Sequence, residues 1–237
     1  MVESTDTAGT TEAPSKKVSF SYWSDPLCIW AFLAQDKLDR VVTEFGERLA
    51  IETRIVPVFG SLALRFSKGP WAKAGVAGRV EETRRIAAEL GHPEVDGECW
   101  RVSMPASSWA PGVAVKAAAV LERAGSAEVG TTAEYLRMLR HAFFADNRNI
   151  AQRRVLLEVA EDLRIARDGL EAGLDDGSAL AALWEDHDAR ERLKIQGSPT
   201  YLFDGGRARL YGNFSYGILR ATIEELLRGL APGGSDC

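Results

Sequence analysis

Large apolar and small polar residues alternate over residues 18–23, the first patterned segment of the chain. This period of two is typical of a β-strand. Residues 28–45 then carry apolar side chains at helical spacing, and Gly46 follows where a helix would end. A second apolar run with strand character covers residues 49–58. The pattern therefore predicts a strand, a helix and a second strand in succession.

Residues 61–194 are predicted to be helical almost throughout, in pieces that end at glycine or proline. Thr131 and Glu134 have the spacing of a capping box, which predicts that one of these helices begins with Thr131 as its cap. The other pieces that we expect span residues 76–90, 113–124, 151–163 and 179–193.

Strand character returns only near the C-terminus, over residues 200–203 and 208–211. The residues between them, Asp204-Gly205-Gly206, are typical of a hairpin turn. Ser215 then precedes a last amphipathic segment and is expected to cap it. The predicted order is strand, helix, strand, a long helical insertion, hairpin and helix.

Composition argues against a nucleic-acid-binding or membrane-spanning protein. The chain has 237 residues, with 29 Lys and Arg against 34 Asp and Glu, and a net charge of −5. Mild acidity gives no reason to expect a nucleic-acid partner, and no apolar run approaches the roughly 20 residues that span a membrane. Residues 1–16 are polar, lack aromatic residues and have no apolar signal core, so we expect a disordered tail and a cytoplasmic protein.

Three widely spaced cysteines, Cys28, Cys99 and Cys237, form neither a disulfide framework nor the spacing of a metal site. Cys28 is expected in the first turn of a helix that follows a strand. There the free backbone N–H groups and the helix dipole favour the thiolate, and they can lower a thiol pKa from about 8.5 into a range of roughly 3.5 to 7.5. A small buried apolar residue is the competing interpretation.

The segment Ser24-Asp25-Pro26-Leu27-Cys28-Ile29-Trp30-Ala31 resembles the active-site segment of the DsbA-like branch of the thioredoxin superfamily, which reads Asp-Pro-x-Cys-Pro-Trp-Cys. Gly197-Ser198-Pro199-Thr200 is similar to the cis-proline loop of that superfamily, and residues 107–111 and 139–144 are similar to parts of its helical insertion. The resemblance implies a thioredoxin-like α/β fold with an inserted α-helical domain. The thioredoxin-like part would comprise residues 17–60 and 195–231, the insertion residues 61–194, and a flexible tail residues 232–237.

The chain departs from this pattern at Ala31, where dithiol members carry the resolving cysteine. A lone thiolate remains suited to covalent catalysis in which it adds and leaves again. The same branch is similar to 2-hydroxychromene-2-carboxylate isomerase and kappa-class glutathione transferases. This implies a cis–trans isomerase of a conjugated polyene or enoyl small molecule, free or tethered to a carrier protein, in natural product biosynthesis such as a polyketide pathway. It would need neither a metal nor a redox cofactor.

Two alternatives stay open. A monothiol oxidoreductase would use glutathione or another low-molecular-weight thiol to resolve a mixed disulfide at Cys28. A binding module would keep the fold with an unreactive Cys28 whose pKa is ordinary or raised. A homodimer also stays open.

The resemblance and the residue types together suggest the rest of the site. Asp25 is a candidate proton shuttle or water positioner, although Asp before Pro is also a common turn former. Pro199, if cis, would present the Ser198 backbone to a substrate. The residues expected to contact the substrate are Trp23, Ser24, Trp30, Trp71, Trp109, Ser198, Pro199 and Thr200, with core packing as the alternative for the tryptophans.

Overall fold

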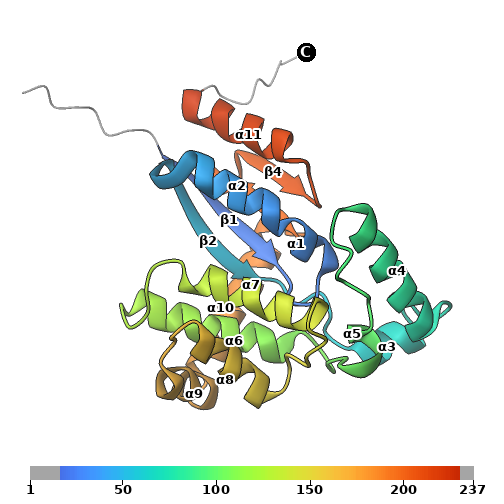
Figure 1. The fold of residues 1–237 in the computed structure, drawn as a ribbon. Helices are drawn as coiled ribbons and strands as arrows, with labels where there is room; N and C mark the ends of the chain where they lie inside the picture. The colour runs from blue at the N-terminus through green and yellow to red at the C-terminus, as the bar shows by residue number, and fades with distance from the viewer. Residues whose placement is uncertain (1–16, 230–237) are drawn as a thin grey trace, which may run out of the picture.

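The computed structural model describes residues 17–229, so the predicted tails over residues 1–16 and 232–237, and Cys237, lie outside the described residues. A four-stranded sheet lies at the centre of the fold (Figure 1). Its order is β2-β1-β3-β4, with β2 parallel to β1, β3 antiparallel to β1 and β4 antiparallel to β3. The strands span Val18–Ser24 (β1), Leu49–Ile55 (β2), Thr200–Phe203 (β3) and Ala208–Tyr211 (β4).

Alternation along β1 divides the side chains of the sheet between two apolar clusters. Phe20 and Tyr22 pack on one face against helices α2 (Gln35–Phe45) and α11 (Tyr216–Arg228). Trp23 packs on the opposite face with a separate cluster that includes Ala189 and Leu193 of α10 (Ser178–Leu193). The period of two seen in the sequence therefore assigns these side chains to opposite faces.

The helices between β2 and β3 form the part of the molecule that lies below the sheet and to its right in Figure 1. Except for Ala189 and Leu193 of α10, their buried apolar side chains form one cluster together with Ile29 and Leu33 of α1 (Ile29–Leu33). In residues 17–229, no helix is both long and apolar enough to cross a membrane. These helices, besides α10, span Leu62–Ser67 (α3), Gly75–Glu89 (α4), Cys99–Val102 (α5), Trp109–Arg123 (α6), Thr131–Phe144 (α7), Arg153–Asp162 (α8) and Arg167–Asp175 (α9).

The single helix expected over residues 28–45 is two helices, α1 and α2, which meet at Ala34. Ala34 has ψ −12°, which departs from the ψ of about −42° of a regular α-helix. The two helices bury different side chains, because α1 contributes to the cluster of the helical insertion and α2 to the cluster on the sheet. The break at Ala34 therefore lets α1 and α2 pack into different clusters.

The second strand ends at Ile55, three residues before the predicted end. The cause is a competing acceptor, since the backbone N–H groups of Val58 and Phe59 donate to the carboxylate of Asp25. These donors are therefore not available to a strand neighbour, and the chain leaves the sheet toward the site.

The predicted capping box at Thr131 and Glu134 is wrong. The N-cap of α7 is Gly130, with φ 94°, a conformation that glycine adopts readily. Glu122 of α6 accepts hydrogen bonds from the backbone N–H groups of Gly130 and Thr132, while Glu134 pairs with Arg137. Ser215 stands at the N-cap of α11 as expected, but its side chain makes no capping hydrogen bond.

Candidate active site

Cys28 is the N-cap residue of α1, at the end of the loop that follows β1. Cys28 is 5% exposed, and its thiol donates to the backbone oxygen of Ser198, with 3.3 Å between Sγ and O. The Ser198–Pro199 peptide bond is cis. The Ser198 hydroxyl accepts a hydrogen bond from the backbone N–H of Asp25 at 2.9 Å. The fold thus brings together Asp25, Cys28, Ser198 and Pro199, which the sequence places about 170 residues apart.

Burial raises the pKa of the Cys28 thiol above its ordinary value. The Ser198 side chain, the Ala31 backbone N–H and Arg140 act in the opposite direction, and Asp25 adds to the rise. The start of the helix acts in the expected direction, since the Ala31 backbone N–H lowers the pKa of Cys28, but burial outweighs it. The physical reason is that Cys28 lies within the apolar cluster around α1, where a charged thiolate loses its water.

Asp25 is fully buried, and neutral donors surround its carboxylate. One oxygen accepts from the backbone N–H of Leu27 at 2.7 Å. The other accepts from the Ser108 hydroxyl at 2.7 Å and from the N–H groups of Val58 and Phe59 at 2.6 and 3.3 Å. Burial raises the pKa of Asp25 to about 6, although each of these hydrogen bonds lowers it. Asp25 therefore joins three segments of the site and titrates near neutral pH.

Arg140 of α7 also belongs to the site, although the sequence alone does not indicate a role for it. It is 1% exposed, and its Nη2 donates to the hydroxyl of Ser24 at 2.5 Å and lies 3.5 Å from the backbone oxygen of Asp25. Its Nε has no hydrogen-bond partner in the part of the chain that the structure describes. An arginine between Leu139 and Phe143, on the apolar face of a predicted helix, was the available signal.

Ser24 and Thr200, two of the predicted substrate contacts, are buried and make internal hydrogen bonds. The Thr200 hydroxyl donates to the Gly197 backbone oxygen at 2.8 Å, and the Ser24 hydroxyl accepts from Arg140. Both residues therefore hold the loops that carry Ser198 and Cys28.

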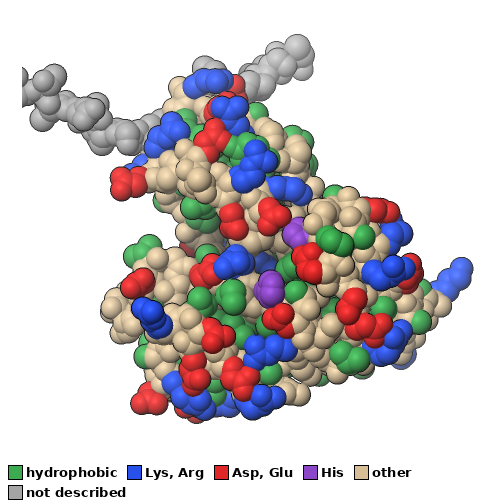
Figure 2. Space-filling model, viewed as in Figure 1, with side chains coloured by type: hydrophobic (Ala, Val, Ile, Leu, Met, Phe, Trp, Pro, Cys, Tyr) green, Lys and Arg blue, Asp and Glu red, His purple; other side chains and the backbone are tan. Residues whose placement is uncertain are grey.

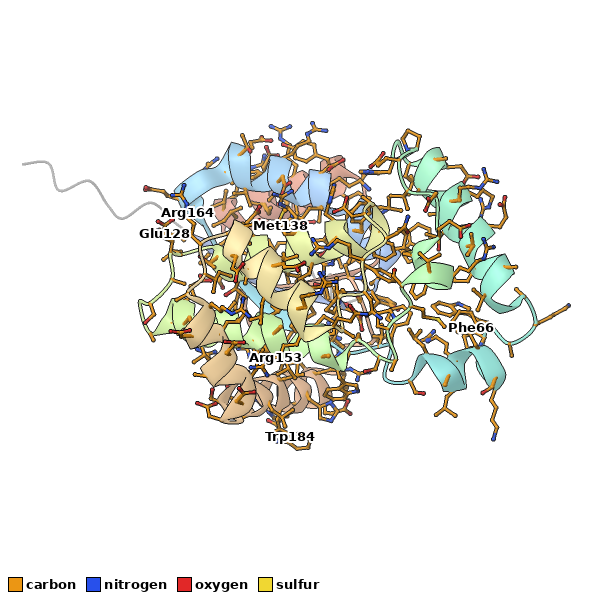
Figure 3. All side chains as sticks on the ribbon, turned by 60° about the horizontal axis from the view of Figure 1, so that its bottom comes forward. Phe66, Glu128, Met138, Arg153, Arg164 and Trp184 are labelled. Carbon is orange, nitrogen blue, oxygen red and sulfur yellow. The ribbon has the colours of Figure 1, made fainter. Side chains whose placement is uncertain are left out.

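The four candidate tryptophans fall into two groups. Trp23 is buried and donates its Nε1 proton to the Ser21 hydroxyl at 2.7 Å. Trp71 packs in an aromatic cluster, with its ring 5.2 Å from that of Phe66, which points from α3 toward the neighbouring helices in Figure 3, and 5.3 Å from that of Trp100. Core packing thus accounts for these two. Trp30 and Trp109 are 42% and 40% exposed, and they remain candidates for a substrate contact.

Residue 31, at the position of the second cysteine in dithiol members, is a fully buried alanine. Cys28 and Cys99 are both free. Cys99 begins α5 in the interior, and burial raises its pKa to about 12. Cys99 therefore behaves as a packed core residue.

The sheet, the helical insertion and the loop pairing Cys28 with Ser198 define a thioredoxin-like protein of the DsbA type. The sequence profile of the DsbA-like thioredoxin domain matches residues 20–224, and the chain belongs to this family. The expected fold, a thioredoxin-like α/β fold with inserted helices, is confirmed.

The proteins to which this chain is similar carry different descriptions. The chain is 27% identical over 212 residues to the ClpXP adapter protein SpxH of Halalkalibacterium halodurans, covering 86% of this chain and 65% of that protein, which is slightly less than two thirds. It is similar to the cytosolic disulfide reductase DsbM of Pseudomonas aeruginosa, with 24% identity, a TM-score of 0.66 and coverage of 90% and 100% of the two chains. It is also similar to a 2-hydroxychromene-2-carboxylate isomerase, with 17% identity, a TM-score of 0.64 and coverage of 89% and 97%.

Proposed function

We propose that the chain is a cysteine-dependent cis–trans isomerase of a conjugated polyene or enoyl small molecule. The observation that carries the proposal is a lone thiol, Cys28, in a loop that a buried guanidinium contacts. Arg140 donates to Ser24 and to the Asp25 backbone oxygen of this loop and has no carboxylate partner among residues 17–229. A dithiol reaction has no local resolving group, because Ala31 occupies that position. Addition and elimination by one thiolate needs neither a second thiol nor an oxidant.

The reaction balances without net consumption of any reagent. The Cys28 thiol first loses its proton to water. The thiolate then forms a bond to one carbon of the conjugated double bond, and the π electrons move toward the conjugated carbonyl oxygen. The former double bond rotates as a single bond, and the returning electrons expel the thiolate and leave the other geometric isomer. The positive charge of Arg140 lowers the pKa of Cys28 and thereby favours the thiolate that burial disfavours.

A monothiol oxidoreductase is the alternative that the surroundings of the thiol also support. In this reaction the Cys28 thiolate would attack a disulfide of the substrate, and an external thiol would resolve the mixed disulfide. A structure of the Pseudomonas aeruginosa disulfide reductase with GSH makes glutathione the first external thiol to test.

A binding module is the third candidate. The raised pKa of Cys28 agrees with an unreactive thiol, and the relatives described as ClpXP adapter proteins are binding proteins by name. This candidate predicts that Cys28 can be replaced without functional consequence.

The test follows the geometric isomers of conjugated polyenoyl compounds over time by chromatography, with no added thiol. We expect conversion by the wild type and a loss of at least about 10³-fold in Cys28→Ser, because the nucleophile is removed. Cys99→Ala is the matched control, since Cys99 is a buried thiol of the core, and it should convert the substrate like the wild type.

The other outcomes separate the three candidates. A mixed disulfide at Cys28 that glutathione releases, without isomerisation, supports the oxidoreductase. Absence of both reactions, with full binding of a protein partner by Cys28→Ser, supports the binding module. Either result overturns the isomerase.

A further inference from the structure

A cavity of about 660 Å³ lies where the edge of the sheet meets the helical insertion. Strand β2 and helix α2 form one side of it, and α6 and α7 form the other. Figure 2 shows the hollow on this face, between the upper and lower parts of the molecule. Its apolar lining includes Leu38, Val42, Leu49, Ile51, Ala119 and Leu136. The volume is in the range of sites for small molecules, about 300–1,000 Å³.

The acidic residues that line this cavity each have a partner of their own. Asp39 accepts from the Gln35 amide, Glu52 pairs with Arg54, Glu134 pairs with Arg137, and Glu122 accepts from the backbone at the start of α7. The buried Lys116 pairs with Asp186 at 2.8 Å.

Arg140 also lines the cavity. Unlike Lys116, it has no carboxylate partner within the described chain. It is almost completely buried, and its Nε is left without an acceptor. A buried cation without a counter-charge and a buried donor without an acceptor are both costly. A ligand carboxylate or polarised carbonyl in the cavity would supply the missing counter-charge, and the planar guanidinium is well suited to bind such an oxygen.

Arg140 connects this cavity with the loop that carries Cys28, because it also contacts Ser24 and the Asp25 backbone oxygen. A second cavity, of about 200 Å³, shares Gln35, Asp39 and Arg140 with the first. The guanidinium therefore lies where both spaces meet the Cys28 loop.

We propose that the cavity between β2, α2, α6 and α7 binds a linear unsaturated acyl chain whose carboxylate or thioester carbonyl oxygen accepts hydrogen bonds from Arg140. The apolar lining holds the chain, and the guanidinium fixes its polar end beside the Cys28 loop. The unsaturation of the chain rests on the proposed isomerase function. The acyl chain and its oxygen rest on the cavity and on Arg140.

The first test titrates the protein with cis-parinaric acid, a conjugated tetraene carboxylic acid whose fluorescence rises in an apolar site. Val42→Trp fills the cavity and should weaken binding by about tenfold or more, since it removes apolar contact area. Val102→Trp is the matched control, because Val102 is an exposed valine of α5 outside this lining, and it should bind like the wild type. No saturable binding, or equal binding by the two variants, overturns the proposal.

The second test examines the polar end of the ligand. Arg140→Met should weaken binding of the acid by about tenfold or more, because a charged hydrogen bond is lost. Arg123→Met removes an exposed arginine of the same lining and should change binding by less than about threefold. If Arg140→Met does not fold, as judged by circular dichroism, Arg140→Lys keeps the charge, removes the planar guanidinium and should still weaken binding. Unchanged binding in the folded Arg140 variant overturns the assignment of Arg140.

Repeating the titration with an N-acetylcysteamine thioester of the same polyene tests whether the acyl chain is free or bound to a carrier protein. Tighter binding of the thioester supports a carrier-bound substrate, and tighter binding of the acid supports a free one. Cys28→Ser should bind either probe like the wild type. Wild-type protein that binds the probe in this cavity but does not isomerise it therefore contradicts the proposed function alone, whereas isomerisation by wild type without binding in this cavity contradicts the cavity alone.

Discussion

Asp25 and Asp186 are both fully buried, but their carboxylates have different partners. Asp186 of α10 lies 2.8 Å from Nη1 of Arg54, 2.8 Å from Nζ of Lys116 and 2.8 Å from the backbone nitrogen of Ile55. Within residues 17–229, the Asp25 carboxylate receives hydrogen bonds from neutral donors only. Two cations therefore neutralise one carboxylate, and no direct ion pair neutralises the other.

The Asp186 network therefore has a structural role, whereas the charge of the region around Asp25 depends on pH. The Asp186 network ties α10 and α6 to β2, and its charge is balanced because Glu52 also pairs with Arg54. Asp25 lies beside the thiol, its pKa is raised to about 6, and its charge adds to the raised pKa of Cys28. The charge state at the Cys28 end of the sheet can thus change near neutral pH, which is where a catalytic site benefits from it.

The comparison predicts the largest loss of stability at Asp186. Asp186→Asn leaves the buried Lys116 without a counter-charge, so we expect the free energy of unfolding to fall by about 3–5 kcal/mol. Urea denaturation measures this change. Asp188→Asn on the same helix removes an exposed partner of Arg192 and should cost no more than about 0.5 kcal/mol. A loss below about 1 kcal/mol for Asp186→Asn would remove the distinction between the two carboxylates.

A smaller effect, which depends on pH, is expected at Asp25. Its folded pKa of about 6 lies above the ordinary value of 3.8 for this group, so the folded protein binds the proton more tightly. The contribution of Asp25 to stability is present below about pH 4 and is lost as the pH rises through about 6. The loss is roughly 2–3 kcal/mol.

The measurement compares the free energies of unfolding of wild type and Asp25→Asn at pH 4 and pH 7. The difference between the two proteins should change by the stated amount, with the wild type relatively more stable at the acidic end. A difference that stays constant with pH would show that Asp25 does not titrate in this window.

The smallest effect is expected from Ser108→Ala, which removes one neutral donor from Asp25. We expect a loss of about 1.5 kcal/mol at pH 7, since the acceptor is a buried carboxylate. The pKa of Asp25 should rise further, because this hydrogen bond lowers it. Ser107→Ala, the adjacent position, should cost less than about 0.5 kcal/mol. NMR titration of the Asp25 carboxyl carbon gives the direction of the pKa change, and a lowered pKa would contradict the assigned role of Ser108.

Much of the fold follows from local pattern. The alternation in β1, the order of elements and the position of the helical insertion depend on neighbouring residues, and the sequence predicts them. The approach of Ser198 to Cys28 was also expected, but from the resemblance to a family and not from residue spacing.

The errors concern contacts between distant segments. The partner of the α7 start is Glu122 of another helix, and the end of β2 depends on the Asp25 carboxylate. The pKa of Cys28 depends on burial within a cluster formed mostly by the insertion. Arg140 was overlooked because its lack of a carboxylate partner becomes visible only when all the neighbours are in place.

The distance along the chain between Cys28 and Ser198 has a consequence for synthesis of the protein. Strand β3 begins only at Thr200, so the thiol meets its backbone acceptor after most of the polypeptide has left the ribosome. The helical insertion, which buries α1, is likewise made after Cys28. During translation, therefore, the nascent chain carries an uncovered thiol, and oxidants can reach it before the fold protects it.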